Sequence, residues 1–522
     1  MKTYYDVHCH IFNKDVIIRR LVNIVQSLIA IKDMLNGEVS ESELKFKIDG
    51  INRTLEKVTR DTSEEVFDAL NQVYKDKVVT TPLMFDLTYA DDNDDDENSN
   101  KRYRRRIKRI FKAAYFLLPV IKLKIRDKAL RDALNPIRDG LKEFEKKFDK
   151  KSEQEVEIFD NSNYTQQIAD LEYMAQKYKT VKPFFSVDPR REYKSGARMI
   201  DLLREKILAP NALFAGVKLY APAGFSPTDP VLMGNDGQQG VYALCLEHAI
   251  PITVHNSNAG FACLSKKLII NGHIKKNGSV EEVKNYKHDF EYDFFSFKAG
   301  EAIKERALLL NHPKIWEKVM EKYPDLTINF AHFGGSGQIL EYVKYLLPQK
   351  IEIDTFEKAL KNATPEDKNR VKSIYTPKRK FLYLNSNIIF TERAKIWNIM
   401  YHHGIIDNWA KAIFDIVKKP EYPNAYTDLS CFSEGILVNL PGDNSPQPVF
   451  SIKTELAEVK RSSFDKLSDY EKSKILYGSD FFLAQFFGPT MEQYFADFQQ
   501  AFDNDFDVIA SVNPERFLGI KK

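Results

Sequence analysis

Short runs rich in β-branched and aromatic residues recur along the chain, and segments with helical spacing of apolar residues lie between most of them. Each short run predicts a β-strand. The predicted strands cover residues 3–8, 78–85, 181–187, 214–219, 251–256, 326–331, 424–429 and 474–479. Strands that alternate with helices favour parallel pairing. Eight of them predict an α/β fold of the (β/α)8 TIM-barrel class.

Such a barrel needs about 250 residues, whereas the chain has 522. We expect the excess in large, mostly helical insertions after the first, second and sixth strands. These insertions cover residues 14–75, 90–175 and 336–405. Because each leaves the carboxyl end of a strand, together they are expected to form a helical cap over the mouth of one barrel domain spanning residues 1–522.

The composition and net charge of the chain indicate which kinds of binding partner to expect. Hydrophobic residues make up 43% of the chain and charged residues 29%, which is ordinary for a soluble globular protein. The net charge of +3 gives no general attraction to nucleic acid or anionic lipid. No apolar run reaches the ~18–20 residues that span a bilayer. We therefore expect a small-molecule substrate and neither a nucleic-acid nor a membrane partner, and a homo-oligomer is compatible with the sequence.

The cysteines and the first residues of the chain indicate the cellular compartment in which the protein is expected to fold. Cys9, Cys245, Cys263 and Cys431 are scattered and form no C-x-x-C pair. This indicates reduced thiols in a cytosol-like compartment rather than a disulfide framework. The first residues lack a basic region followed by an apolar core, which a secretory signal would have. A cytoplasmic protein is expected.

Two charged segments in the second insertion each have an ordinary and a functional interpretation. The acidic run at 91–100, DDNDDDENSN, lacks the spaced ligands and the glycine of an EF-hand, so a solvated loop is favoured over a calcium site. In the basic stretch from residue 101, Ile107, Ile110 and Phe111 recur at helical spacing. An amphipathic helix beside the acidic run is favoured over a polyanion site.

The first predicted strand ends in a pair of histidines. In YYDVHCH, residues 4–10, one residue separates His8 from His10. Residues i and i+2 of a strand point to the same side, so the two imidazoles can meet at one metal ion. A pair with this spacing also arises by chance in roughly one such sequence in five. The other strands must therefore support the interpretation.

Other predicted strands also end in residues that titrate or bind metals. Lys218 closes the fourth strand, His255 the fifth, His332 the sixth and Asp480 the eighth. A charged group at the end of an apolar run is costly unless it is paired or binds something. Closure of the barrel would bring these side chains to one mouth, where this fold places its active site.

These motifs together resemble the amidohydrolase superfamily of metal-dependent barrels, and most closely its amidohydrolase 2 branch, which also includes aromatic-acid decarboxylases. The resemblance runs from Asp6 to Ile520, skips the three insertions, and departs from the family in their length. It rests on the H-x-H pair, VHNS at 254–257, HPKIWEKVMEKYPDLTINFAHFGG at 312–335, ILYGSDFF at 475–482 and NPERFLGI at 513–520.

The resemblance implies roles for the strand-end residues. His8, His10, His255 and Asp480 would hold the metal, and His332 would bind a second metal or polarise the substrate. Imidazoles with a carboxylate suit Zn²⁺ best, with Mn²⁺, Fe²⁺ or Ni²⁺ as alternatives. One ion is expected, and two are the alternative.

The expected function is hydrolysis of a small-molecule amide, lactone or ester by a metal-activated water. Asp480 would accept the proton of that water, and His332 would donate a hydrogen bond to the developing oxyanion. A metal-dependent non-oxidative decarboxylase of an aromatic or enol acid is the alternative. A catalytically inactive barrel that serves as a binding module is the third hypothesis.

Lys218 has three interpretations. In binuclear members of that superfamily a fourth-strand lysine is carboxylated and bridges two metals. A plain lysine could hold an anionic group of the substrate, or it could extend its charge toward solvent without a catalytic role. Tyr220 and Phe333 are expected to contact the substrate, although ordinary packing explains such aromatic residues equally well.

Weaker candidates lie near the same strand ends. Asp6 is expected to accept a hydrogen bond from a metal-binding histidine, with a strand-end hydrogen-bond partner as the alternative. Asp86 and Asp428 follow the second and seventh strands and suit a pocket and a structural role equally well. Cys9 points away from His8 and His10 and is expected to pack into the wall.

Overall fold

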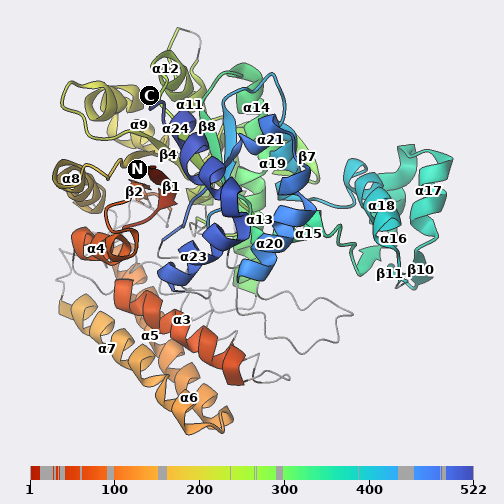
Figure 1. Cartoon of the computed structure of the whole chain (residues 1–522), viewed down its shortest axis with the longest axis horizontal. Coiled ribbons are helices and arrows are strands. Elements are labelled where there is room, and N and C mark those ends of the chain that lie inside the picture. Colours follow the sequence, from red (N-terminus) through yellow and green to blue (C-terminus); the bar gives the residue numbers. More distant parts are fainter. Residues whose placement is uncertain are drawn as a thin grey trace.

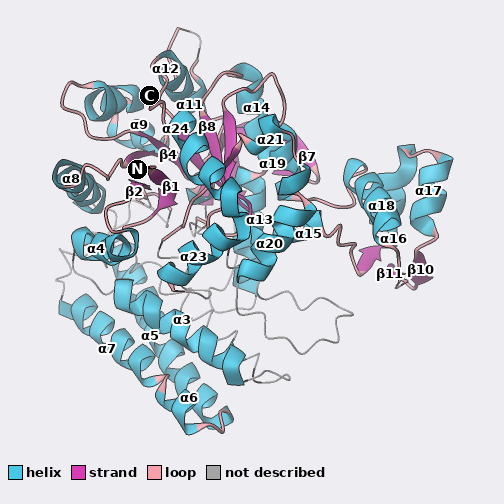
Figure 2. Ribbon diagram, in the orientation of Figure 1, coloured by secondary structure: helices cyan, strands magenta, loops and turns pink. Residues whose placement is uncertain are grey.

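The computed structural model shows a mixed α/β protein (Figures 1 and 2). It describes residues 2–11, 41–58, 62–86, 88–90, 99–150, 162–235, 237–260, 267–289, 298–385, 387–432, 452–481 and 490–520, together with Leu28, Ile31, Lys32, Leu35, Ala262, Cys263, Ser265 and Ala484. The acidic run at 91–98 and most of residues 12–40 lie outside the described residues.

A parallel sheet of six strands, in the order β13-β12-β8-β5-β4-β3, forms the centre of the molecule. The strands are β3 (Phe184–Val187), β4 (Gly216–Leu219), β5 (Ile252–Ser257), β8 (Ile328–Gly334), β12 (Ala425–Asp428) and β13 (Ile475–Leu476). A second sheet pairs β1 (Tyr4–Cys9) with β2 (Val78–Pro82), also in parallel. The eight strands coincide with the eight predicted runs, so their existence and parallel pairing are confirmed.

Backbone contacts join the two sheets at both of their edges. Val7 N–H donates to the carbonyl of Tyr477 (3.2 Å), and His10 N–H donates to that of Phe481 (2.7 Å). On the other side, isolated bridges pair Thr80 with Val181 and Leu83 with Phe184. The described strand pairing nevertheless gives two sheets and not one continuous barrel.

Helices precede the strands as the sequence pattern predicts. They are α12 (Val241–Glu247) before β5, α14 (Pro313–Lys322) before β8, and α19 (Trp409–Val417) before β12. Every residue of β3, β4, β5, β8 and β12 is buried. Parallel strands covered on both faces are expected to be apolar along their whole length, which explains why these runs were recognisable.

A group of helices lies below the sheets in Figure 1. It consists of α3 (Glu41–Val58), α5 (Ser99–Lys124), α6 (Lys128–Asp132) and α7 (Asn135–Lys150), and is called the helical bundle below. Further along the same insertions, α4 (Ser63–Tyr74) contacts α8 (Ser162–Lys177). The described parts of the first two insertions are therefore helical, and the helix predicted in the basic stretch is α5, with Phe111 buried.

The sequence pattern did not predict two further features. A long antiparallel hairpin, β6 (Lys267–Lys276) and β7 (Ser279–Asp289), follows β5. A lobe projects at the right of Figure 1, with a core of its own around Trp397. The lobe contains α16 (Ile353–Ala359), α17 (Pro365–Lys372), α18 (Phe390–His402) and a sheet of β9 (Lys350–Glu352), β10 (Tyr375–Lys378) and β11 (Phe381–Leu384). The third insertion is thus helical only in part.

The remaining helices pack around the sheets (Figure 2). They are α9 (Arg190–Ser195), α10 (Met199–Leu203), α11 (Pro230–Met233), α13 (Lys298–Asn311), α15 (Ser336–Val343), α20 (Ile452–Ser462), α21 (Asp469–Lys472), α23 (Met491–Phe502) and α24 (Asn513–Phe517). None of the helices in the described part of the chain is long and apolar enough to cross a membrane.

Candidate metal centre

Three buried side chains converge where β1 ends and the chain leaves β13. His8 Nε2 lies 3.5 Å from Asp480 Oδ1, and His10 Nε2 lies 3.2 Å from the same oxygen. A tetrahedral ion with ligand distances of about 2.0–2.1 Å keeps its donor atoms about 3.3–3.4 Å apart. The distances from both imidazoles to Asp480 therefore fit one small divalent cation, and the three donor atoms all lie within 4.8 Å of one another.

Hydrogen bonds at the opposite ring nitrogens orient both imidazoles. His8 Nδ1 lies 3.2 Å from Asp428 Oδ2, and His10 Nδ1 lies 3.2 Å from the carbonyl oxygen of Leu83. These oxygens only accept, so in the neutral rings Nδ1 carries the proton and Nε2 keeps its lone pair. Histidines that bind metals are typically held in this way.

Two of the three atoms that face one another lack a hydrogen-bond partner in the part of the chain that the structure describes. These buried atoms are His8 Nε2 and Asp480 Oδ1. Burial lowers the pKa of His8 to about 3, so its imidazole is neutral at pH 7. A neutral imidazole and a carboxylate are the forms that bind a metal. The unsatisfied electron pairs can therefore be stabilised by a cation.

Ser430 lies at a second convergence of donor atoms. His8, His332 and Asp428 also lie close enough together to form a ligand group. However, the Ser430 hydroxyl is 3.0 Å from His8 Nδ1 and 2.9 Å from His332 Nδ1, and it hydrogen-bonds Asp428 Oδ1. Contacts with the Ser430 hydroxyl therefore connect the side chains of this group.

Asp428 anchors the hydrogen-bonded network. Its Oδ1 accepts the backbone N–H groups of His332 (2.9 Å) and Ser430 (3.0 Å), and its Oδ2 accepts the side-chain amide of Asn329 (2.7 Å). Burial opposes ionisation, but electrostatic attraction to His8 and hydrogen bonds from His8 and Ser430 lower the pKa of Asp428. Of the two roles left open for Asp428, the structure supports a place at the site.

His255 and His332 lie beside this network and contact each other. His332 Nε2 is 3.0 Å from His255 Nδ1, and His255 Nε2 is 3.0 Å from the carbonyl oxygen of Ala259. The carbonyl fixes a proton on His255 Nε2, so His332 donates its Nε2–H to His255. Burial lowers the pKa of both imidazoles. The ligand groups found among the described residues do not include His255.

Lys218 brings a cationic group to the same region. Its Nζ is buried, has no hydrogen-bond partner within the described chain, and lies 5.9 Å from the centre of the Tyr220 ring. Burial lowers the pKa of Lys218 to about 8, although Asp428 and Asp480 favour the charged form. A lysine that extended toward solvent would not be buried in this way. The ammonium is mostly charged at pH 7 and can contact an anion.

The backbone is left-handed at two of the site residues. Asp480 has φ 52°, and His332, Phe333, Gly334 and Gly335 follow one another with φ 69°, 46°, 82° and 104°. A non-glycine residue in this conformation costs about 1–3 kcal/mol, and such residues concentrate at functional sites. The strain at His332 and Asp480 supports a functional role for both.

Aromatic rings line one side of the candidate centre. The Tyr220 ring centre lies 4.5 Å from that of His255 and 4.4 Å from that of Phe85. Phe85 in turn lies 6.1 Å from His10. Tyr220 is therefore near the site, as expected. Phe85 was missed as a site residue, although it stands at the end of the second predicted strand.

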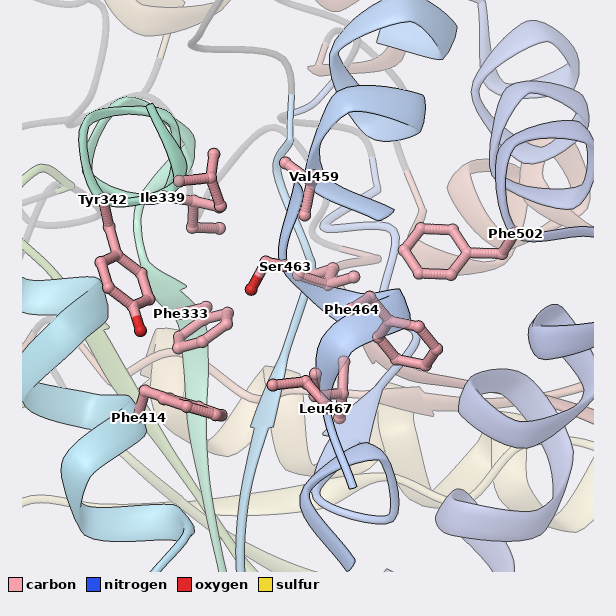
Figure 3. Close-up of a pocket in the computed structure, with 12 residues that line it drawn as sticks. Phe333, Ile339, Tyr342, Phe414, Val459, Ser463, Phe464, Leu467 and Phe502 are labelled. Carbon is pink, nitrogen blue, oxygen red and sulfur yellow. The ribbon is translucent and has the colours of Figure 1, made fainter. Parts of the chain in front are cut away.

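Phe333 is placed elsewhere. It lines a small apolar cavity between β8 and the surrounding helices, together with Tyr342 and Phe414 (Figure 3). Its ring centre lies 6.2 Å from that of Phe414. The ring of Phe333 therefore faces the helices that cover β8 and not the histidines. This placement gives Phe333 a packing role and does not support a contact with the substrate.

The Asp6 carboxylate accepts hydrogen bonds from backbone N–H groups and hydroxyls, and not from an imidazole. Its carboxylate accepts the backbone N–H groups of His8 (3.2 Å) and Ser479 (2.9 Å) and the hydroxyls of Ser479 (2.6 Å) and Tyr74 (2.8 Å). These contacts match the alternative, a strand-end hydrogen-bond partner. They fix the end of β1 against the segment that carries Asp480.

Asp86 and Cys9 have structural surroundings. Asp86 forms a buried ion pair with Arg191 (2.5 Å), and the same guanidinium donates to Thr88. The carboxylate of Asp86 therefore pairs with the guanidinium of Arg191 and not with the histidines. Cys9 is completely buried in the central core, as its position opposite the histidines predicts.

The chain was also compared with known proteins. No model of a protein family matches it, and neither a curated protein nor a solved structure is significantly similar to it. The chemistry of the site is therefore inferred from its own residues.

Proposed function

We propose that this protein is a metal-dependent hydrolase related to the amidohydrolase 2 branch, with the eight parallel strands forming a (β/α)8 barrel. The barrel is supported by the strand order and by the backbone contacts at both edges of the β1–β2 sheet. The observation that carries the metal-dependent function is the convergence of donor atoms of His8 and Asp480, which have no hydrogen-bond partner among the described residues, with His10 at a distance that suits one ion.

His8, His10 and Asp480 would hold the ion. Two imidazoles and a carboxylate suit Zn²⁺ best, with Mn²⁺, Fe²⁺ and Ni²⁺ as alternatives. We propose one ion, because the Ser430 hydroxyl connects the second ligand group. His255 is the fourth proposed ligand. It would have to exchange its contact with His332 or Ala259 for the metal.

The reaction proposed is attack of water on an acyl carbon, with cleavage of its C–N or C–O bond. The bound ion would supply Lewis-acid polarisation and a lowered pKa for water. Asp480 accepts the proton of the attacking water and transfers it to the leaving nitrogen or oxygen. His332 turns its Nε2–H from His255 to the acyl oxygen as negative charge develops there. Lys218 binds an anionic group of the substrate.

A non-oxidative decarboxylase of an aromatic or enol acid is the second candidate. It is favoured by the buried ammonium of Lys218, which has no hydrogen-bond partner among the described residues and lies 5.9 Å from the ring centre of Tyr220, which in turn contacts Phe85. A cation next to aromatic rings suits an aromatic carboxylate. Release of carbon dioxide, rather than of an amine or alcohol, would distinguish this activity from hydrolysis in a substrate screen.

Metal content tests the proposed centre. Protein purified without added metal or chelator is expected to carry about one ion per chain by plasma mass spectrometry. His10→Ala should lose most of it, while His402→Ala, at an exposed histidine of α18, should keep it. Circular dichroism confirms that each variant is folded. A full metal load in folded His10→Ala would refute the proposed ligand set.

The metal content of His255→Ala, measured in the same way, tests whether His255 is the fourth ligand. Loss of metal comparable to that of His10→Ala would support coordination by His255. Full retention would restrict the ligand set to His8, His10 and Asp480, and would leave His255 as the acceptor for His332 that the structure shows.

A further inference from the structure

Helix α5 has an unusual distribution of charge. Residues 99–124 contain ten lysine and arginine residues and no aspartate or glutamate, although the whole chain has a net charge of only +3. The buried face of the helix packs into the helical bundle through Phe111, Ala114, Leu117, Leu118 and Ile121. The buried side of α5 therefore contributes to the core of the helical bundle, and the opposite side faces solvent.

The outer face combines basic and apolar side chains. Arg109, Lys112, Phe116, Pro119 and Leu123 are all exposed. They recur every three or four residues, so they lie along one side of the helix. Phe116 is 72% exposed and Leu123 is 87% exposed. A single exposed apolar side chain is ordinary, but here two large ones share one face with cationic groups.

Exposed basic residues also occur beyond the end of α5, in a segment that contains Asp127 and Asp132 as well. Arg126, Lys128 and Arg131 are exposed in the segment that leads through α6, close in sequence to Leu123. In Figure 1 this segment forms the end of the helical bundle farthest from the sheets. The cationic groups and the exposed Leu123 therefore occur together at a projecting end of the molecule.

We propose that this face of α5 binds the surface of a bilayer that contains anionic lipids. The basic side chains pair with the headgroups, while Phe116 and Leu123 insert at the boundary between headgroups and acyl chains. This departs from the sequence-based expectation of no membrane partner, which rested on the net charge of the whole chain and on the lack of a spanning segment. An interfacial helix requires neither a high total charge nor a long apolar run.

Nucleic acid fits this face less well. A phosphate backbone would satisfy Arg109 and Lys112. Only Phe116 and Arg109 could stack on bases, which contact aromatic rings or guanidinium groups, whereas the exposed Leu123 and Pro119 have no stacking surface to offer. The apolar half of the face therefore favours a lipid surface.

Vesicle sedimentation tests the proposal with the full chain. Binding is expected to phosphatidylcholine vesicles that contain phosphatidylglycerol, and at least about tenfold weaker binding to phosphatidylcholine alone. Phe116→Ser with Leu123→Ser should weaken binding about tenfold, and so should Arg109→Glu with Lys112→Glu. Ile389→Ser is the matched control, because Ile389 is also 72% exposed but lies in the lobe. It should bind as the unmodified protein does.

Several results would overturn the proposal. One is equal binding to both kinds of vesicle, and another is binding that the α5 variants leave unchanged. Single-stranded RNA is the third comparison. RNA binding that depends on Arg109 and Lys112, together with the absence of vesicle binding, would assign the face to a nucleic acid. All four substituted side chains are exposed, so circular dichroism should show an unchanged fold.

Discussion

Gly478 shows how little space surrounds the candidate metal ligands. It precedes Ser479 and Asp480 and passes between the end of β1 and Ser430. A Cβ atom at this position would lie 2.8 Å from the Cβ of His8 and 3.0 Å from the Cβ of Ser430. Such contacts are shorter than packed side chains allow. Glycine is needed here for close approach of two backbones, and any side chain must displace a residue of the site.

Gly478→Ala is therefore expected to weaken metal binding. Displacement of His8 or of its partner Ser430 disturbs the orientation of the ligand, which typically costs about 10- to 100-fold in metal affinity. Competition with a chromophoric chelator measures this loss for Zn²⁺. Gly337→Ala is the control, because a Cβ there meets no atom within 4 Å. Equal affinities for the two variants would show that the ligand set adapts to the added methyl group.

Helix α20 carries a buried carboxyl group, Glu455. The residue is 8% exposed, and its Oε2 has no hydrogen-bond partner in the part of the chain that the structure describes. Burial raises the pKa of Glu455 to about 7, against the attraction of Lys344. The folded state thus holds a proton that the unfolded chain releases near its ordinary pKa of 4.5. Stability is therefore expected to fall as the pH rises from about 4.5 to about 7.

Glu455→Gln should remove this pH dependence. At about pH 8 the variant is expected to be more stable than the unmodified protein by at most about 3 kcal/mol, because the glutamine amide carries no charge to bury. At about pH 4.5 the two proteins should be nearly equal. Thermal unfolding at both pH values measures the difference. A difference that is the same at both would contradict the assigned cause.

The elements also show what sequence patterns can predict. The eight strands were found because each contains a short run rich in β-branched and aromatic residues, which buried parallel strands require, although several have polar residues near their ends, such as Lys218 and His255. The hairpin was missed because β7 is largely exposed and gives no hydrophobic pattern. His8 and Asp428 each stood out at a strand end, but their contact joins residues 420 positions apart. The Ser430 hydroxyl, which connects three of the site residues, has no signature in sequence that separates it from other serines.

The whole molecule contains more than one hydrophobic core. The central cluster extends through the two sheets, their helices and the helical bundle, whereas the lobe has a separate cluster around Trp397. Trp397 is completely buried and lies among aromatic residues, with its ring centre 5.5 Å from that of Tyr401 and 5.7 Å from that of Tyr342. The proposed metal centre lies outside this lobe core. The two regions are therefore expected to respond separately to substitution.

Trp397→Ala should unfold the lobe without abolishing metal binding. Truncation of a buried tryptophan costs about 3–5 kcal/mol, a large fraction of the stability of a small core. Limited proteolysis should then cut between β9 and α18, while the metal content stays the same. Trp316→Ala removes a fully buried tryptophan of the central core and should reduce both protease resistance and metal content. Loss of metal in Trp397→Ala would show that the lobe supports the site.

The meeting of β1 with the segment after β13 has a consequence for how the protein is made. The backbone N–H groups of Ser479 and Asp480 both donate to the carbonyl of His8, at 3.1 and 2.7 Å. Ser479 is added 471 positions after His8. At about 5–20 residues per second this interval lasts roughly 25 to 95 seconds. The three side chains therefore come together only after Asp480 has been synthesised, and a chain that terminates before this residue lacks the carboxylate that lies between the histidines.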